Sequence, residues 1–555
     1  MKAGFLAAAA LLAACSSTPP RPVSEQQPDP QPFPLPYTEI EAETGVTTGR
    51  VSSFSTDLYD PGAEASGRRY VTLAPQTDLK VTVPSKADSV VIRYSLPSGK
   101  DGKLTLTTLA GAVDLRLTAK FQGVYGQPKW GSVNVWRDQA SGGQKRHFWD
   151  EASRQIPEFS GGFQVTNAGN DPVLIDLLDF EKVAPAVAAP AGSVSFSSFR
   201  PDATGQKDVT DLFQKALDQA KGGVLYVPEG TYRIDSVSLA NVTVQGAGLW
   251  RTRFVGPASQ FRFSGKTARV ADLAVWGETT TRNDTSDEEN AFAGQPGAGS
   301  VVERVWVEHK KCAFWVGNWG SQTPVTGLTI AGCRFRDTMA DGVNLCSGTS
   351  NTTVSGCLIR NTGDDGLAAW SPKNGGPAGG GNTFDGNLVQ QPWLANGIAL
   401  YGGGPFTVKG NVVKDTVTTG SGLYIASAFN AWPFQGTIDV RQNLLIRCGA
   451  HESDTGGPTG AIRVLAAETP LTSVSITFAD NTVADPTESA VSFQGPLSVG
   501  DLKFSGFNVT DLAPNAQVAD IRGNAQGSAS FSGLDTGAQQ GSWRNMAGAD
   551  FAVTR

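Results

Sequence analysis

The chain has 555 residues, enough for more than one domain, and its 65 glycines separate short runs rich in valine, isoleucine and threonine, as in an all-β protein. A formal net charge of −7 argues against nucleic acid or an anionic polymer as the partner. The three histidines are not spaced with cysteine as in a zinc site, and the G-x-S-x-G nucleophile motif is absent.

The chain begins with a predicted lipoprotein signal peptide, residues 1–15. Lys2 precedes an apolar run too short to span a bilayer, and polar residues follow it. The run ends in Leu-Ala-Ala-Cys15, which resembles the bacterial lipobox, whose cysteine becomes the lipidated N-terminus. We therefore expect a lipid anchor at Cys15 that tethers the protein to the extracytoplasmic side of a membrane in the cell envelope. A secretory signal without lipidation is the alternative.

A linker and a β-sandwich are expected next. Residues 16–36 are rich in proline and polar side chains and cannot build a core. Residues 37–183 alternate short apolar segments with turn residues, which predicts a β-sandwich of the jelly-roll type.

The ends of this sandwich resemble carbohydrate-binding modules of families 6 and 35. The resemblance rests on IEAETG at Ile40–Gly45 and LIDLLDFEKV at Leu174–Val183. It implies a structural calcium ion at Glu43 and Asp179, and oxygen ligands suit that ion. The domain would then bind polysaccharide weakly or support the next domain.

After a second linker, residues 184–192, the rest of the chain (193–555) is predicted to form one domain. Asp208 is a candidate N-cap for a helix whose apolar residues follow helical spacing, and Gly222 ends it. This helix and the following V-x-x-G-T-Y motif resemble the start of a pectate-lyase-like right-handed parallel β-helix. Such a helix would cover the open apolar end of the first coil.

Similar apolar segments, several of the form V-x-G-N/C-x-V/I, then recur along the domain. One apolar marker per repeat gives steps of 24, 30, 24 and 32 residues: Ile330, Val354, Phe384, Val408 and Val440. These steps correspond to a minimal coil of 24 residues with insertions on some turns. Such a repeat predicts an all-β fold of the parallel β-helix type rather than a propeller. Cys312, Cys333 and Cys357 are spaced by about one coil each, and we interpret them as an inward stack without catalytic role.

The candidate catalytic residues lie in the ADG and GDDG motifs. Asp341 and Asp365 are separated by the 24 residues that separate Ile330 from Val354, so they should stack on successive coils with Asp364 beside them. Like charges so close disfavour simultaneous ionisation, so one carboxyl keeps its proton near neutral pH. A general acid and a general base can then share one site, as glycoside hydrolysis requires. Plain turn chemistry is the alternative.

These motifs, with VWVEHKKCAFWV (Val305–Val316) and NGIALYGG (Asn396–Gly403), resemble glycoside hydrolase family 87, the α-1,3-glucanases and mycodextranases. The resemblance implies hydrolysis of α-1,3-glucosidic bonds in α-1,3-glucan or nigeran, with inversion and without a cofactor. By analogy, Asp364 would be the acid, and Asp341 and Asp365 would activate water. An inverting mechanism of this kind needs about 6.5–9.5 Å between the acid and base carboxyl groups, which leaves room for the water. We expect a monomer.

Aromatic and polar side chains near the same coils are expected to bind substrate. An apolar sugar face packs well on an aromatic ring, and polar groups fix its orientation. For each residue, a place in the core is the alternative. The expected substrate contacts are His309, Trp315, Trp370, Asn396 and Tyr401.

Three other functions share this scaffold. A polygalacturonase-like enzyme has the same Asp…Asp-Asp arrangement, but its Gly-His-Gly motif and basic clamp for a uronate are missing here. A polysaccharide lyase needs a basic proton abstractor with calcium, and we find no Arg or Lys placed with the aspartates in the sequence. A solenoid could also bind polysaccharide without cleaving it.

Overall fold

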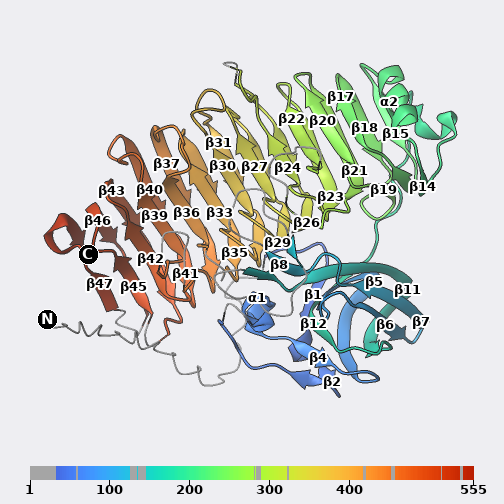
Figure 1. Ribbon diagram of the computed structural model, residues 1–555, viewed down its shortest axis with the longest axis horizontal. Coiled ribbons are helices and arrows are strands. Elements are labelled where there is room, and N and C mark those ends of the chain that lie inside the picture. Colours follow the sequence, from blue (N-terminus) through green and yellow to red (C-terminus); the bar gives the residue numbers. More distant parts are fainter. Residues whose placement is uncertain are drawn as a thin grey trace, which may run out of the picture.

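The computed structural model contains an antiparallel β-sandwich packed beside a parallel β-helix (Figure 1). The signal peptide with Cys15 lies outside the residues that it describes. No helix in the described part is long and apolar enough to cross a membrane. The described residues are 33–57, 60–125, 134–135, 145–280, 282, 289–321, 324–416, 420–451, 457–513, 516–537 and 542–555.

The sandwich is built from one antiparallel sheet in the order β3-β4-β12-β5-β11-β6-β7, with β1 on β12 and β2 on β5. Its two long strands alternate buried and exposed residues in several stretches, and the buried ones form a core separate from that of the β-helix. The strands are β1 (Thr38–Glu41), β2 (Val46–Thr47), β3 (Arg50–Val51), β4 (Val71–Leu73), β5 (Asp78–Ser95), β6 (Asp101–Thr108), β7 (Gly111–Thr118), β11 (Asp150–Asn167) and β12 (Val173–Glu181). A small sheet holds β8 (Gly123–Tyr125), β9 (Asn134–Val135) and β10 (Lys145–His147); the helical turns are η1 (Ala42–Thr44), α1 (Pro61–Glu64) and η2 (Ser66–Arg68).

The second domain is a parallel β-helix, as predicted. Each strand pairs in parallel with the equivalent strand of the next coil, and the five apolar markers of the repeat lie directly opposite one another. One sheet runs through β17 (Ser236–Leu239), β20 (Gln260–Ser264), β22 (Phe292–Gln295), β24 (Phe314–Val316), β27 (Val343–Cys346), β30 (Leu367–Trp370), β33 (Ile398–Tyr401), β36 (Leu423–Ser427), β39 (Ile462–Ala466), β42 (Ser489–Gln494), β45 (Gln517–Ile521) and β47 (Ser542–Asn545). We call it the site sheet.

The remaining coil strands form a second, continuous sheet. They are β13 (Val194–Ser195), β14 (Thr204–Asp208), β15 (Val224–Val227), β16 (Gly230–Arg233), β18 (Val242–Gly246), β19 (Thr252–Val255), β21 (Ala268–Trp276), β23 (Val301–Glu308), β25 (Thr329–Ala331), β26 (Arg334–Thr338), β28 (Thr353–Ser355), β29 (Leu358–Thr362), β31 (Asn382–Asp385), β32 (Leu388–Gln390), β34 (Phe406–Lys409), β35 (Val412–Lys414), β37 (Gly436–Arg441), β38 (Leu444–Ile446), β40 (Val474–Ala479), β41 (Thr482–Ala484), β43 (Ser498–Ser505), β44 (Asn508–Thr510), β46 (Gln526–Ser532) and β48 (Phe551–Thr554). Two short turns are η3 (Phe196–Phe199) and η4 (Gly548–Asp550).

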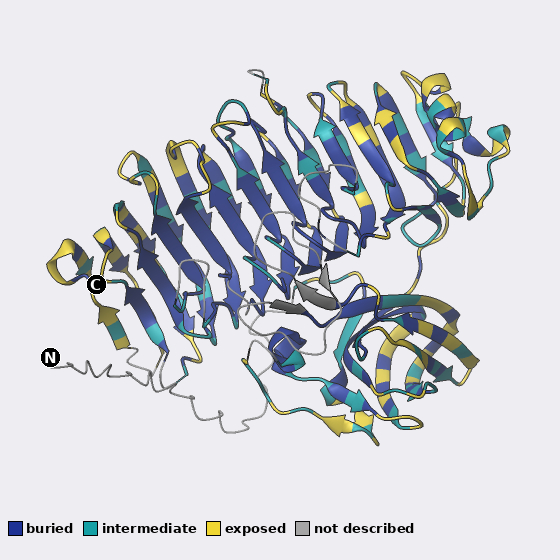
Figure 2. Ribbon diagram, viewed as in Figure 1, coloured by how far each residue is buried: buried dark blue, intermediate teal, exposed yellow. Residues whose placement is uncertain are grey.

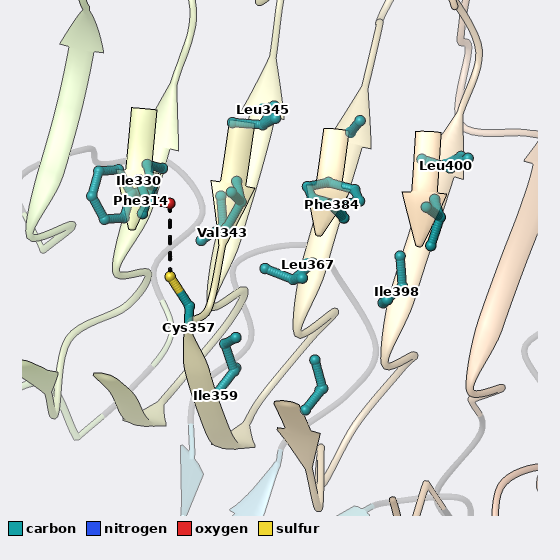
Figure 3. Close-up of a cluster of buried hydrophobic side chains, with 14 of the residues drawn as sticks. Phe314, Ile330, Val343, Leu345, Cys357, Ile359, Leu367, Phe384, Ile398 and Leu400 are labelled. Atoms are coloured by element: carbon teal, nitrogen blue, oxygen red, sulfur yellow. Dashed lines mark hydrogen bonds between the residues drawn. The ribbon is translucent and has the colours of Figure 1, made fainter. Parts of the chain in front are cut away.

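Inward-facing side chains stack from coil to coil inside the β-helix. Figure 3 shows Phe314, Val343, Leu367 and Ile398 at equivalent positions of successive site-sheet strands. All four are buried, and each is worth about 1.5–3 kcal/mol of transfer free energy. This column fixes the register of the strands and therefore the positions of the turns that follow and precede them.

The V-x-G-N/C pattern marks a buried polar column. Asn387, Asn411, Asn443 and Asn481 lie on successive coils, and each side-chain amide of the first three donates to the next Oδ1 at 2.9 Å. Cys357 and Cys333 continue the column, as predicted, because their strands pair in that register. The prediction for Cys312 was wrong. Its Sγ lies 3.9 Å from Asp341 Oδ2, at a different corner of the coil.

Helix α2 (Thr210–Gln219) covers the first coils, as expected. Phe213 is buried on this end and contacts Phe254 and Phe261. The N-cap position belongs to Val209, but the carboxylate of Asp208 still accepts a hydrogen bond from the Thr210 N–H at 2.7 Å. The apolar end of the solenoid is thereby removed from water.

The sandwich docks on the β-helix through buried ion pairs. Arg360 Nε donates to Glu151 at 2.5 Å and its Nη2 to Asp179 at 2.5 Å, while Arg336 Nη1 lies 3.3 Å from Glu151. The middle strands of the β-helix are buried on both faces (Figure 2), consistent with an outer face covered by the sandwich. Residues 33–36, predicted as part of a linker, contribute Phe33 and Leu35 to an apolar cluster on these coils.

Candidate active site

Three carboxylates meet at one corner of the β-helix. Asp341 immediately precedes β27, and Asp364 with Asp365 precedes β30, the next strand of the site sheet. One oxygen from each of the three lies within 4.8 Å of the others. The 24-residue repeat therefore places these side chains on adjacent coils.

Burial and mutual repulsion raise the pKa of two of them. Burial, Asp364 and Asp365 together raise the pKa of Asp341 well above its usual value. Burial and the charge of Asp364 raise the pKa of Asp365 to about 7. The cluster therefore keeps at least one proton near neutral pH, shared between Asp341 and Asp365.

Asp364 has a different environment because Arg282 Nη1 donates to its Oδ2 at 2.7 Å. Arg282 is buried and comes from the loop after β21, 82 residues earlier. The sequence-based statement that no Arg or Lys is placed with the aspartates was therefore wrong. No repeat or motif marks this arginine, so sequence reasoning had no signal for it.

Asn396 and Tyr401 were predicted to bind substrate, but in the structure they hold Asp365. Asn396 donates from Nδ2 to Asp365 Oδ1 at 2.8 Å and from its backbone N–H at 3.0 Å. The Tyr401 hydroxyl donates to Asp365 Oδ2 at 2.9 Å. These bonds favour the ionised carboxylate and partly offset the rise in the pKa of Asp365.

The nearest oxygens of the three carboxylates lie within 4.8 Å of one another. The expected separation of about 6.5–9.5 Å applies to whole carboxyl groups, which can lie farther apart than their nearest oxygens. The side chain of Asp364 folds back and accepts the backbone N–H of Asp365 at 3.0 Å.

Trp315 and Trp370 lie on strands of the site sheet, next to the acidic corner. With Trp319 they form an aromatic cluster: the ring centroids of Trp315 and Trp370 are 6.2 Å apart, and those of Trp319 and Trp370 are 5.8 Å apart. Asn344, which pairs in register with Trp315, bonds to Asp341 and favours its ionised form. The two predicted tryptophans are therefore neighbours of the acidic corner.

His309, also predicted to bind substrate, lies instead between the two domains. Its ring stacks on Phe121 at 3.6 Å between centroids, and its Nε2 lies 2.7 Å from Asp150 of the sandwich. Burial lowers the pKa of His309, but the charge and hydrogen bond of Asp150, together with the charge of Asp337, more than offset this, so the pKa is raised. His309 lies in the motif Val305–Val316, which is close to the catalytic motifs in sequence. That closeness did not show which way the His309 side chain points.

Glu43 and Asp179, the predicted calcium ligands, have different surroundings. Asp179 accepts a hydrogen bond from Arg360 of the β-helix. The charge of Glu43 acts on Glu41 and Asp176 of the sandwich, and Arg447 and Asp415 of the β-helix act on Glu43. Glu43 lies in the turn η1 and Asp179 in strand β12, and the two short motifs did not show which groups surround each side chain.

The chain matches known proteins over both domains. Residues 34–183 match the family model "Alpha-1,3-glucanase catalytic domain D1", and residues 202–453 match "Alpha-1,3-glucanase catalytic domain D2". The sandwich thus matches part of a catalytic unit, where the sequence resembled a carbohydrate-binding module. No curated protein matches the chain.

Solved structures give the same result. The catalytic unit of a thermostable GH87 α-1,3-glucanase from Streptomyces thermodiastaticus is 32% identical, with a TM-score of 0.83 over 94% of this chain and 96% of that one. The Agl-KA catalytic domain is 27% identical, with a TM-score of 0.83 over 94% and 98%. A GH87 α-1,3-glucanase in complex with nigerose is 22% identical, with a TM-score of 0.75 over 94% and 98%.

Proposed function

The chain belongs to glycoside hydrolase family 87, the α-1,3-glucanases, and on this premise we propose that it hydrolyses α-1,3-glucosidic bonds of an α-glucan by inverting acid–base catalysis with Asp341, Asp364 and Asp365. The observation that carries the proposal is the meeting of these three carboxylates on adjacent coils. The raised pKa values of Asp341 and Asp365 let acid and base forms coexist at neutral pH.

Structures of distant neighbours support this substrate class. GH87 α-1,3-glucanase catalytic domains that are 21–22% identical to this chain, three of them carrying an aspartate-to-alanine substitution, were solved in complex with nigerose or tetrasaccharides. The exposed and half-buried tryptophans of the present site suit such neutral sugars, whose apolar faces pack on rings.

In the proposed reaction, Asp341 and Asp365 take a proton from water, which attacks the anomeric carbon, and Asp364 gives a proton to the leaving glycosidic oxygen. The proton that the empty cluster keeps on Asp341 or Asp365 must first pass to Asp364. This requires the ion pair between Asp364 and Arg282 to loosen when substrate binds. The net result adds water across the bond and returns the cluster to its starting charge.

Replacing each aspartate by asparagine tests the assignment. Each single variant should lower kcat by about 10²–10⁴, since that is the worth of positioned acid–base catalysis. The losses should not add, because the groups act as a unit. Near-wild-type turnover by the Asp364→Asn variant would show that Asp364 is not the general acid.

The anomer released first tests the stereochemistry. The prediction of inversion rests on the family resemblance, and the nearest-oxygen distance does not carry it. Proton NMR early in the reaction should show the β-anomer released from an α-linkage, and the α-anomer would mean retention. Ultraviolet-absorbing unsaturated ends would instead indicate a lyase.

We also propose that lipidation of Cys15 anchors the enzyme on the extracytoplasmic side of the membrane. The lipobox-like sequence supports this location. A Cys15→Ser variant should move from the membrane fraction to the medium, as measured by immunoblotting. Retention of the variant in the membrane fraction would contradict the anchor.

A further inference from the structure

Three aromatic side chains are exposed beside the acidic cluster. Trp319, Phe429 and Trp432 have exposed fractions of 43%, 38% and 39%. Within the described residues, the other exposed large apolar side chains are aliphatic and belong to the sandwich or to the last strands: Val46, Val51, Leu109 and Met546. The exposed aromatic surface is therefore concentrated at one place.

The three rings come from loops that follow strands of the site sheet. Trp319 follows β24, whereas Phe429 and Trp432 follow β36. Both loops contact the loop after β30: Gly320 N–H donates to Gly375 O at 2.8 Å, and the Trp432 indole N–H donates to Gly376 O at 2.9 Å. Strands far apart in sequence thus place these rings on one connected set of loops.

The rings also connect to the catalytic cluster. Phe429 packs edge-on against Tyr401 with centroids 5.1 Å apart, and Tyr401 holds Asp365. The Trp370 indole N–H donates to Phe429 O at 3.1 Å, and Trp370 contacts Trp319. A chain of contacts between aromatic residues therefore links Asp365 to the exposed rings.

The exposed rings are held in place before any ligand binds. The indole hydrogen bond of Trp432 and the ring contacts of Trp319 fix their orientation while part of each ring stays in water. Clustered exposed apolar surface marks a binding site, and rings fixed in advance lose little conformational entropy on binding. A glucose unit has an apolar face and a polar hydroxyl rim, which matches a half-exposed ring with a wet edge.

We propose that Trp319, Phe429 and Trp432 form subsites that bind glucose units of the α-glucan beyond the bond being cleaved. The proposal rests on the hydrolysis of α-glucan argued above and adds the residues that determine chain-length preference. It predicts that longer chains bind more tightly because they reach more rings.

The test compares Trp319→Ala and Trp432→Ala on α-1,3-linked oligosaccharides of increasing length. KM should rise by about tenfold or more for the longest chains, equivalent to about 1.4 kcal/mol of lost binding. The effect should shrink as the chain shortens, with kcat changed far less than KM. Trp432→Phe should recover part of the loss, and Leu109→Ala, which is 99% exposed in the sandwich, is the matched control that should behave as wild type.

A second readout separates this proposal from the proposed function. In an Asp365→Asn background, binding of the same oligosaccharides should change the intrinsic tryptophan fluorescence, and Trp432→Ala should weaken that binding by about tenfold. If Trp319→Ala and Trp432→Ala both kept wild-type affinity and KM for long chains, the proposed subsites would be wrong. Failure of the wild type to cleave any α-1,3-linked substrate would overturn the proposed function, while the fluorescence titration would still decide the subsites.

Discussion

Asp365 is the residue whose surroundings are most fully determined. It is buried, lies beside a second carboxylate, and accepts hydrogen bonds from Asn396 and Tyr401 on the next coil. Burial and repulsion favour its protonated form, whereas the two donors favour its ionised form. The balance leaves its pKa near 7, where a carboxyl can exchange protons with water during turnover.

Removing one donor should move the pH dependence of catalysis. In Tyr401→Phe the ring stays but the hydroxyl that favours ionised Asp365 is lost, so the pKa of Asp365 should rise above about 7. A base must be ionised to act, so the acid limb of kcat/KM should shift upward by about one to two pH units, given about 1.5–3 kcal/mol for a bond to a charged group. The control is Tyr226→Phe, whose hydroxyl bonds to Val187 O far from the site. A loss independent of pH would argue against this role.

The same pKa shift predicts how stability depends on pH. The folded-state pKa of Asp365 lies above the unfolded value of 3.8, so the native state binds more protons between these values and loses stability as pH rises from about 4 to about 7. Asp365→Asn removes this cost. Its free energy of unfolding should exceed that of the wild type by on the order of 2–4 kcal/mol at pH 8 and by little at pH 4. Denaturant unfolding at the two pH values measures this difference, and an equal difference at both would contradict it.

Elements that repeat could be predicted from the sequence, and those that depend on long loops could not. The apolar markers from Ile330 to Val440 define the coils because each strand must bury its inward face against the next. The same repeat placed Asp341 and Asp365 together. Arg282 gave no periodic signal, because it reaches the site from the segment between β21 and β22. Cys312 lies about one coil from Cys333 in sequence, but it sits at another corner of the coil, so its spacing was misleading.

The asparagine column should be a main source of stability for the β-helix. In Asn411→Ala the amide that donates to Phe384 O and Asn443 Oδ1 is lost, and Asn387 loses its acceptor. Buried polar groups left without partners cost about 1–3 kcal/mol each, so the free energy of unfolding should fall by about 3 kcal/mol or more. Thr437→Ala in β37, at an exposed position, is the control and should change it by less than about 0.5 kcal/mol. Equal effects in both variants would mean that the column contributes little.

At the scale of the whole molecule, the sandwich and the β-helix act as one unit with two cores. Each domain has its own apolar cluster, yet charged side chains that are exposed in most proteins are buried between them. The sequence predicted both folds from their patterns. It could not predict their docking, because Glu151 and Arg360 are far apart in the chain and neither belongs to a repeat or motif.

The buried ion pairs should make domain docking sensitive to pH. Burial alone would raise the pKa of Glu151, but Arg336 and Arg360 outweigh it and lower the pKa to about 2. Because this folded pKa lies below the unfolded value of 4.5, Glu151 stabilises the native state above about pH 4.5, and this contribution is lost as pH falls toward 2.

Arg360→Met should therefore destabilise the protein mainly at neutral pH. It leaves the carboxylates of Glu151 and Asp179 buried without their main partner, which costs about 3–5 kcal/mol. The pKa of both carboxyls should rise, so protonation relieves the cost and the deficit relative to wild type should shrink as pH falls from 7 toward 5. Arg544→Met removes an Arg–Asp pair whose arginine is 42% exposed, and it should cost less than about 1 kcal/mol at any pH. Denaturant unfolding of both variants across this pH range measures the two losses of stability. Similar losses in the two variants would show that the ion pairs do not hold the domains together. A deficit for Arg360→Met that grows as pH falls would show the same.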